Sequence, residues 1–118
     1  MNILGSSTTV RSTDRSSAVR RYSALFGTDP LHEFPIEDRG LTVDVFPGIS
    51  VLSGPRAALA ELANLRATVF VGSVSEAEAE LVAGGWTVVG SLGGGASLLV
   101  SDPDGNVLEF VENPGTTK

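Results

Sequence analysis

The stretch SDPDGNVLEFVE, Ser101–Glu112, contains a turn followed by an apolar run, and it decides how the second half of the chain folds. The segment Asp102–Gly105 is a strong turn signal, because Pro presets the backbone dihedral of a turn and Gly accepts a positive φ. Strands are predicted on either side of it, at 96–101 and 106–111. These two strands are therefore expected to form an antiparallel β-hairpin.

The segment before this hairpin has the order strand, helix, strand. The run RATVFV at 66–71 is rich in β-branched and aromatic residues, which predicts a strand. Ser73 and Glu76 form a capping box that begins a helix, and the glycine pair 84–85 ends it. A further short strand is predicted at 86–89. The second half thus follows the pattern strand, helix, three strands.

The first half of the chain repeats this pattern. A strand is predicted at 3–11, a helix at 14–26 with Ser12 as its N-cap, and strands at 31–36, 41–46 and 49–52. Ser12 precedes Ser73 by 61 positions, which is about half of the 118 residues.

This repeat predicts an α+β fold of tandem βαβββ modules. We expect two curled four-stranded mixed sheets around a cavity, with the helices on the outer faces. The first module is expected at residues 1–54, a linker helix at 55–65, the second module at 66–112 and a frayed tail at 113–118.

Composition excludes several classes of site. The chain has no cysteine and one histidine, His32, which excludes disulfides, thiolate metal sites, cysteine nucleophiles and sites that need two histidines from one chain. The net charge of −6 argues against nucleic acid as a partner. No run of 18 apolar residues and no signal peptide is present, so we expect a cytoplasmic protein that does not span a membrane.

Alternation along two strands indicates a candidate site. In the strand at 66–71 the positions of Ala67, Val69 and Val71 are apolar and are expected under a helix, so Thr68 and Phe70 face the other way. In the strand at 106–111 Leu108 and Phe110 form the helix-covered face, so Glu109 faces the other way. A face that mixes polar and aromatic side chains is typical of a small-molecule site. The residues expected to line it are Thr9, Phe46, Arg66, Thr68, Phe70, Trp86 and Glu109.

Each candidate has a structural alternative. Arg66 and Glu109 are either a polar anchor for a ligand or an internal ion pair. His32 is either a general base or a histidine at the rim of the protein. The aromatic residues Phe46, Phe70 and Trp86 are either a wall of the ligand site or part of the core. The glycine run at 93–95 is expected to be a flexible hairpin loop.

Three segments resemble the vicinal oxygen chelate superfamily, which includes glyoxalase I, bleomycin-resistance proteins and extradiol dioxygenases. They are VRSTDRS at 10–16 with the following Arg21-Tyr22 and Leu25-Phe26-Gly27, RATVFV at 66–71, and the closing hairpin Ser101–Glu112. The resemblance covers nearly the whole chain. It implies paired βαβββ modules around a cavity, and a homodimer.

The resemblance also implies where catalytic members hold a divalent metal ion. These positions fall on Gly5, on Leu52 or Ser53, on Arg66 and on Glu109. Only Glu109 carries a suitable donor, so we expect no metal site and no cofactor.

Three hypotheses about function follow. The first is a metal-free protein of the bleomycin-resistance type that binds and sequesters a small molecule, such as a cationic aromatic antibiotic. The second is an enzyme of the glyoxalase or dioxygenase group, a lyase or oxygenase, that uses Glu109 for proton transfer. The third is an accessory module with a vestigial cavity.

Overall fold

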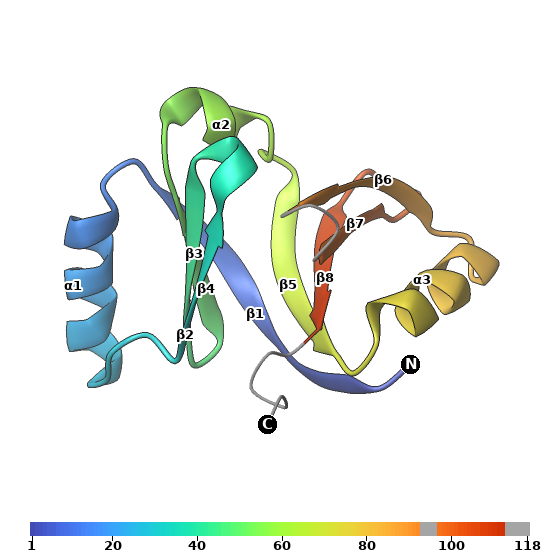
Figure 1. Ribbon diagram of the computed structural model, residues 1–118, viewed down its shortest axis with the longest axis horizontal. Helices are drawn as coiled ribbons and strands as arrows, with labels where there is room; N and C mark the ends of the chain where they lie inside the picture. The colour runs from blue at the N-terminus through green and yellow to red at the C-terminus, as the bar shows by residue number, and fades with distance from the viewer. Residues whose placement is uncertain (93–96, 113–118) are drawn as a thin grey trace. The chain divides into compact units, whose positions relative to one another are not determined.

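A computed structural model describes residues 1–92 and 97–112, and its elements follow the predicted order (Figure 1). The strands are β1 (Ile3–Ser12), β2 (His32–Ile36), β3 (Leu41–Phe46), β4 (Ile49–Ser53), β5 (Leu65–Val71), β6 (Thr87–Leu92), β7 (Ser97–Ser101) and β8 (Val107–Glu112). The helices are α1 (Arg15–Phe26), α2 (Arg56–Ala60), α3 (Val74–Ala83) and a 3-10 turn, η1 (Glu37–Arg39). The α+β fold class is confirmed. The predicted loop at 93–95 and the tail at 113–118 lie outside the described residues.

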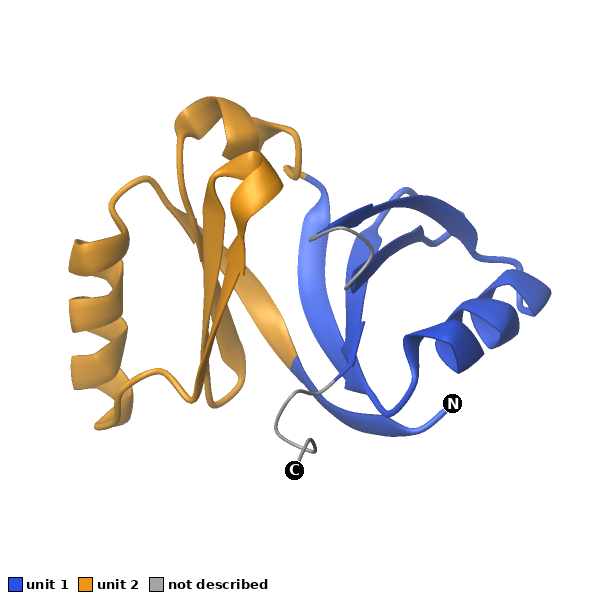
Figure 2. Cartoon of the chain, viewed as in Figure 1, with its two compact units in different colours: residues 1–6, 64–118 blue, residues 7–63 orange. Residues whose placement is uncertain are grey.

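The chain divides into two compact units (Figure 2). Unit 2 is residues 7–63, where the strand order is β2-β3-β4-β1 and β1 runs parallel to β4. Unit 1 is residues 1–6 with 64–118, where the start of β1 is followed by β5-β8-β7-β6 and β5 runs parallel to β8.

Both units have the same internal register. Val10 pairs with Val51 in unit 2, and Val71 pairs with Glu112 in unit 1, so both members of the pair recur 61 positions later. The repeat predicted from the order of elements is therefore a repeat of strand pairing as well.

The core of unit 2 lies between its sheet and α1. Ala18 of α1 packs against the buried Phe46 and Val51. The Phe46 ring lies 5.7 Å from that of Phe26 and 6.0 Å from that of Tyr22, centroid to centroid. Burying a side chain of this size stabilises a fold by about 1.5–3 kcal/mol. Phe46 is thus under the helix, and its predicted placement on the opposite face is wrong.

The N-terminus of α1 also differs from the prediction. Asp14, not Ser12, is the N-cap, since its carboxylate accepts a hydrogen bond from the Ser17 amide at 3.2 Å. Ser12 instead accepts from the Asp14 amide at 3.0 Å. The Arg15 guanidinium then binds both carboxylate oxygens of Asp44 in β3, at 2.8 Å each, which fixes the start of α1 to the sheet.

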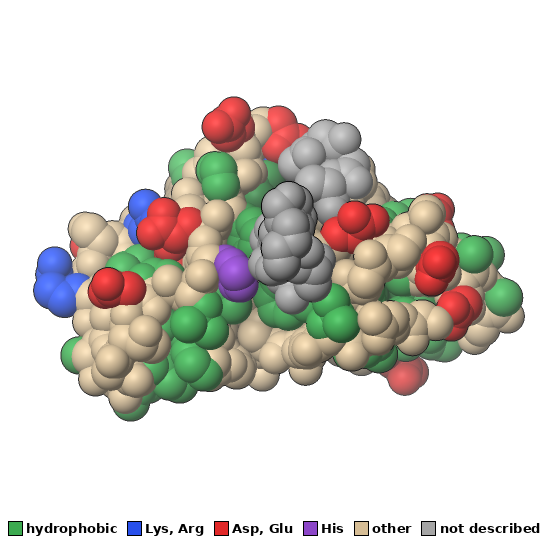
Figure 3. Space-filling view, turned by 60° about the horizontal axis from the view of Figure 1, so that its bottom comes forward, with side chains coloured by type: hydrophobic (Ala, Val, Ile, Leu, Met, Phe, Trp, Pro, Cys, Tyr) green, Lys and Arg blue, Asp and Glu red, His purple; other side chains and the backbone are tan. Residues whose placement is uncertain are grey.

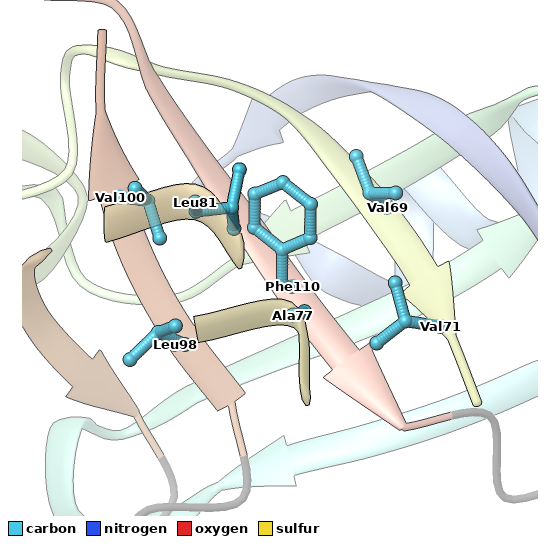
Figure 4. Packing of buried hydrophobic residues seen from close by; sticks show 7 residues of the cluster. All are labelled: Val69, Val71, Ala77, Leu81, Leu98, Val100 and Phe110. Carbon is cyan, nitrogen blue, oxygen red and sulfur yellow. The ribbon is translucent and has the colours of Figure 1, made fainter. Parts of the chain in front are cut away.

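The core of unit 1 lies between its sheet and α3, and Figure 4 shows how its side chains converge. Val69 and Val71 of β5 pack with Phe110 of β8 against Ala77 and Leu81 of α3. The helix begins as predicted, because the Ser73 hydroxyl accepts a hydrogen bond from the Glu76 amide at 3.2 Å.

Two further predictions need correction. Trp86 precedes β6 and packs, partly buried, against the helix-side core of unit 1, so it does not form a wall on the opposite face. The linker helix is shorter than 55–65, because α2 ends at Ala60 and is followed by turns. Among the described residues, no helix has the length and apolar character needed to cross a membrane.

Candidate functional site

The candidate site is a buried acid on the face of unit 1 that does not contact α3. Glu109 of β8 pairs with Thr68 of β5 in the parallel ladder, and the Thr68 hydroxyl donates to Glu109 Oε1 at 3.1 Å. The two residues are 5% and 3% exposed. The alternation that placed both side chains on one face is therefore confirmed.

The side chains around this acid are mainly apolar. Leu99 pairs with Glu109 across the β7–β8 ladder, and Phe70 pairs with Val111 one strand away. Because cross-strand partners point to the same face, these three side chains lie on the face of the sheet that carries Glu109. Ser97 adds a buried hydroxyl that is close enough to affect the acidity of Glu109, although it lies outside regular hydrogen-bond geometry.

Burial perturbs the acidity of Glu109. Loss of contact with water disfavours the carboxylate and raises the pKa of Glu109 above its usual range, while the Ser97 and Thr68 hydroxyls oppose this shift in part. A carboxyl with a perturbed pKa on the face of a sheet is a candidate for binding or proton transfer.

Arg66 does not neutralise this acid. The pairing of β5 with β8 shifts between Leu65 and Ala67, which leaves Arg66 at a β-bulge. Its side chain is exposed and forms no ion pair with Glu109. The internal ion pair considered from the sequence is therefore wrong. Glu109 is the only buried ionisable side chain among the described residues of unit 1.

Unit 2 carries a group of hydroxyls on the face away from α1. Ser7 and Thr9 alternate along β1, and Thr9 pairs with Ser50 of β4. The Ser7 and Ser50 hydroxyls are hydrogen-bonded to each other, whereas Thr9 Oγ1 is buried without a hydrogen-bond partner. Thr9 thus lies on the face of the sheet away from α1, because its neighbour Val10 packs on the α1 side. No acid joins this group within unit 2, since the buried Asp44 lies on the helix side and binds Arg15.

His32 lies on β2, where it pairs with Val45 and its ring contacts Phe34 at 5.9 Å between centroids. No described hydrogen bond or ion pair links it to an acid, so its geometry does not support a general base. Acidic side chains are scattered over the face in Figure 3 rather than gathered in one patch, which is typical of a solvated surface.

Comparisons with known proteins bear on the fold. No protein-family model and no curated protein matches the chain. An uncharacterized protein from Methanosarcina mazei is 26% identical, with a TM-score of 0.82 over 96% of this chain and 94% of that one. Methylmalonyl-CoA epimerase from Mycobacterium tuberculosis is 19% identical, with a TM-score of 0.65 over 96% and 91%. A second methylmalonyl-CoA epimerase structure is 16% identical, with a TM-score of 0.64 over 91% and 92%.

The chain has the vicinal oxygen chelate fold. The metal-ligand positions expected from the sequence resemblance were Gly5, Leu52 or Ser53, Arg66 and Glu109. Gly5 has no side chain, Leu52 is apolar, Ser53 offers only a neutral hydroxyl, and the exposed guanidinium of Arg66 repels a cation. Within the described residues, no three His, Cys, Asp or Glu side chains come together. These residues do not fit a divalent metal ion.

One part of this candidate site was missed from the sequence, namely the side chains of β7. The turn at Asp102–Gly105 pairs Ser101 with Val107, and counting outward by two pairs Leu99 with Glu109. The turn therefore already contained the signal that Leu99, with Ser97 two residues before it, belongs to this face.

Proposed function

We propose that this protein binds a small organic molecule on the Glu109 face of unit 1 and needs no metal ion to do so. The observation that carries the proposal is a buried carboxyl group that forms no ion pair with a described residue of unit 1. Burial of an acid without an oppositely charged partner lowers the stability of the fold. The presence of such a group therefore favours a role in binding.

The surroundings of Glu109 suit a mostly apolar ligand. Phe70, Leu99 and Val111 supply apolar surface, and the acid with Thr68 supplies a polar anchor that orients the ligand. Because Glu109 is only 5% exposed, a ligand that reaches it must displace the groups that cover this face. Antibiotics and other aromatic compounds are within this class.

A thermal-shift screen in the presence of EDTA tests this proposal. The wells contain bleomycin, a thiol adduct of a 2-oxo-aldehyde, and methylmalonyl-CoA, with a parallel series of divalent metal ions without EDTA. A ligand at about 100 times its Kd adds about 2.7 kcal/mol, which raises the Tm of a domain of this size by several degrees.

The variant Glu109→Ala should lose the shift that the wild type shows. Glu78→Ala is the matched control, because Glu78 is an exposed acid on α3 and its removal changes the net charge equally. A similar shift in both variants, or a large shift with a metal ion alone, contradicts the proposal.

A second candidate function is proton transfer, which the raised pKa of Glu109 favours. In its ionised form Glu109 could take a proton from a carbon next to a carbonyl and return it. The fold is shared with proteins named methylmalonyl-CoA epimerase. Deuterium incorporation from D₂O into methylmalonyl-CoA, followed by NMR, tests this. Incorporation with the wild type and none with Glu109→Gln supports catalysis, and no incorporation with either contradicts it for this substrate.

A further inference from the structure

We propose that a cleft beside α1 in unit 2 binds a small molecule that carries both a positive and a negative charge, such as an amino acid. Helix α1 lies against the sheet of unit 2, and the loop after it leads to β2 (Figure 1). The cleft has a volume of about 990 Å³ and is lined by residues of the N-cap segment, of α1, of this loop and of β2. Small-molecule sites commonly have volumes of about 300–1,000 Å³. The cleft contains no residue of the Glu109 face, so this inference is independent of the function proposed above.

The charged groups that line the cleft at the start of α1 already have partners. The Asp14 carboxylate accepts a hydrogen bond from the Ser17 amide at 3.2 Å. The Arg15 guanidinium binds both carboxylate oxygens of Asp44 and lies 3.2 Å from a carboxylate oxygen of Glu33. The capacity of the cleft to bind a ligand therefore depends on the polar side chains farther along α1 and in the loop.

Three of these side chains have no ion-pair or hydrogen-bond partner among the described residues. Arg20 and Asp29 are exposed and form no ion pair, either with each other or with another described residue. The Ser23 hydroxyl oxygen is buried and has no hydrogen-bond partner. Arg20 and Ser23 are three positions apart in α1, so they lie on one face of the helix. A guanidinium, a hydroxyl and a carboxylate thus line one cleft without bonding to one another.

These groups match the two ends of a zwitterion. A guanidinium binds a carboxylate through two parallel hydrogen bonds, and a serine hydroxyl can donate a third. A simple anion would meet the three acids of the cleft, Asp14, Asp29 and Glu33. A simple cation would meet the guanidinium groups of Arg15 and Arg20. A ligand with both charges can place its carboxylate at Arg20 and its ammonium group at Asp29.

Titrations of the full chain followed by NMR test this inference, at low ionic strength where exposed ion pairs are least screened. The probes are free glycine, β-alanine, γ-aminobutyrate and ε-aminocaproate, which are zwitterions whose two charges are separated by increasing distances. Butylammonium and butyrate carry one charge each and serve as controls. The readout is the change in the backbone amide signals of Ser16, Ser23 and Glu33, which all line the cleft.

At least one zwitterion should shift these signals in a saturable manner, and the two single-charge probes should bind about fivefold more weakly or not at all. Arg20→Gln and Asp29→Asn should each weaken the binding of that zwitterion by about fivefold, which is the upper range for an exposed ion pair. The matched controls are Arg21→Gln and Asp38→Asn, which remove the same charges at exposed positions of unit 2 that do not line the cleft. Both controls should bind the zwitterion like the wild type.

Three results would overturn the inference. The first is that no zwitterion shifts the three signals in a folded protein. The second is that butylammonium or butyrate binds as tightly as the best zwitterion. The third is that Arg20→Gln or Asp29→Asn binds the zwitterion as tightly as its control. None of these results bears on the proposed function, because the cleft and the Glu109 face share no residue.

Discussion

The Thr68 hydroxyl donates to Oε1 of Glu109 at 3.1 Å, between directly paired residues of two parallel strands. Both side chains are nearly inaccessible to water, and the exposed Arg66 forms no ion pair with the acid. Unit 1 thus holds an acid whose described hydrogen bonding comes from a neutral donor. This arrangement has consequences for stability that can be measured without a ligand.

Two threonines with different hydrogen bonding should respond oppositely to the same change. Thr68→Val removes a donor to a buried acid and should destabilise the protein by about 1–3 kcal/mol. Thr9→Val removes a buried hydroxyl that has no partner, so stability should be unchanged or higher by about 1 kcal/mol. Urea unfolding measures both variants. Equal losses of unfolding free energy in the two variants would show that packing, and not hydrogen bonding, determines the effect of the substitution.

The variant Glu109→Gln should change how stability depends on pH. The folded state holds the proton of Glu109 up to its raised pKa, whereas an unfolded glutamate releases it near pH 4.3. The wild type therefore loses stability relative to Glu109→Gln as the pH rises from about 4.3 to the raised pKa, by up to about 1.4 kcal/mol per pH unit. Urea unfolding across this pH range gives the difference. A difference in unfolding free energy between the wild type and Glu109→Gln that stays constant with pH would contradict a raised pKa of Glu109.

The ion pair between Arg15 and Asp44 should stabilise unit 2. Arg15→Met leaves the fully buried Asp44 carboxylate without its bidentate partner and should cost about 3 kcal/mol. Glu33→Gln is the control, because Glu33 contacts the same guanidinium at 3.2 Å but is exposed, and its loss should cost less than about 1 kcal/mol. Thermal unfolding compares the two. Similar losses would argue against a special role for the buried pair.

A close approach requires glycine at position 54. A Cβ added to Gly54 would lie 2.5 Å from Leu41 Cδ2 and 2.9 Å from the Gly40 carbonyl oxygen. Because one neighbour is backbone, Gly54→Ala should destabilise the fold by about 1–3 kcal/mol. Gly5→Ala is the control, since a Cβ at Gly5 meets nothing within 4 Å. A Tm for Gly54→Ala equal to that of Gly5→Ala would contradict the steric argument.

The order of elements and half of the candidate site could be predicted from the sequence. In β5 the alternate residues Ala67, Val69 and Val71 are apolar, and in β8 Leu108 and Phe110 flank Glu109, so Thr68 and Glu109 were assigned to the correct face. In β3 the alternation misled, because Leu41, Val43 and Val45 are buried on one face while Asp44 and Phe46 are buried on the other. A strand buried on both faces gives no directional signal, so Phe46 was misplaced.

Other features depend on tertiary contacts that a local pattern does not contain. The β-bulge at Arg66 arises from how β5 pairs with a strand about 40 positions later, and no residue type in 66–71 marks it. The hydrogen-bonded ion pair of Arg15 with Asp44 joins a helix to a strand 29 positions away. The choice of Asp14 over Ser12 as the N-cap is a shift of two residues between two good capping side chains.

The central claim is that Glu109 is a buried acid with no ion-pair partner among the described residues of unit 1, and its titration by NMR tests this claim most directly. The side-chain carboxyl carbon of Glu109, assigned by comparison with Glu109→Gln, is followed as a function of pH in the folded protein. We predict a pKa above the usual glutamate value of about 4.3, because burial disfavours the carboxylate. A pKa at or below that value would show that a cation or water stabilises the charge, and would contradict the account.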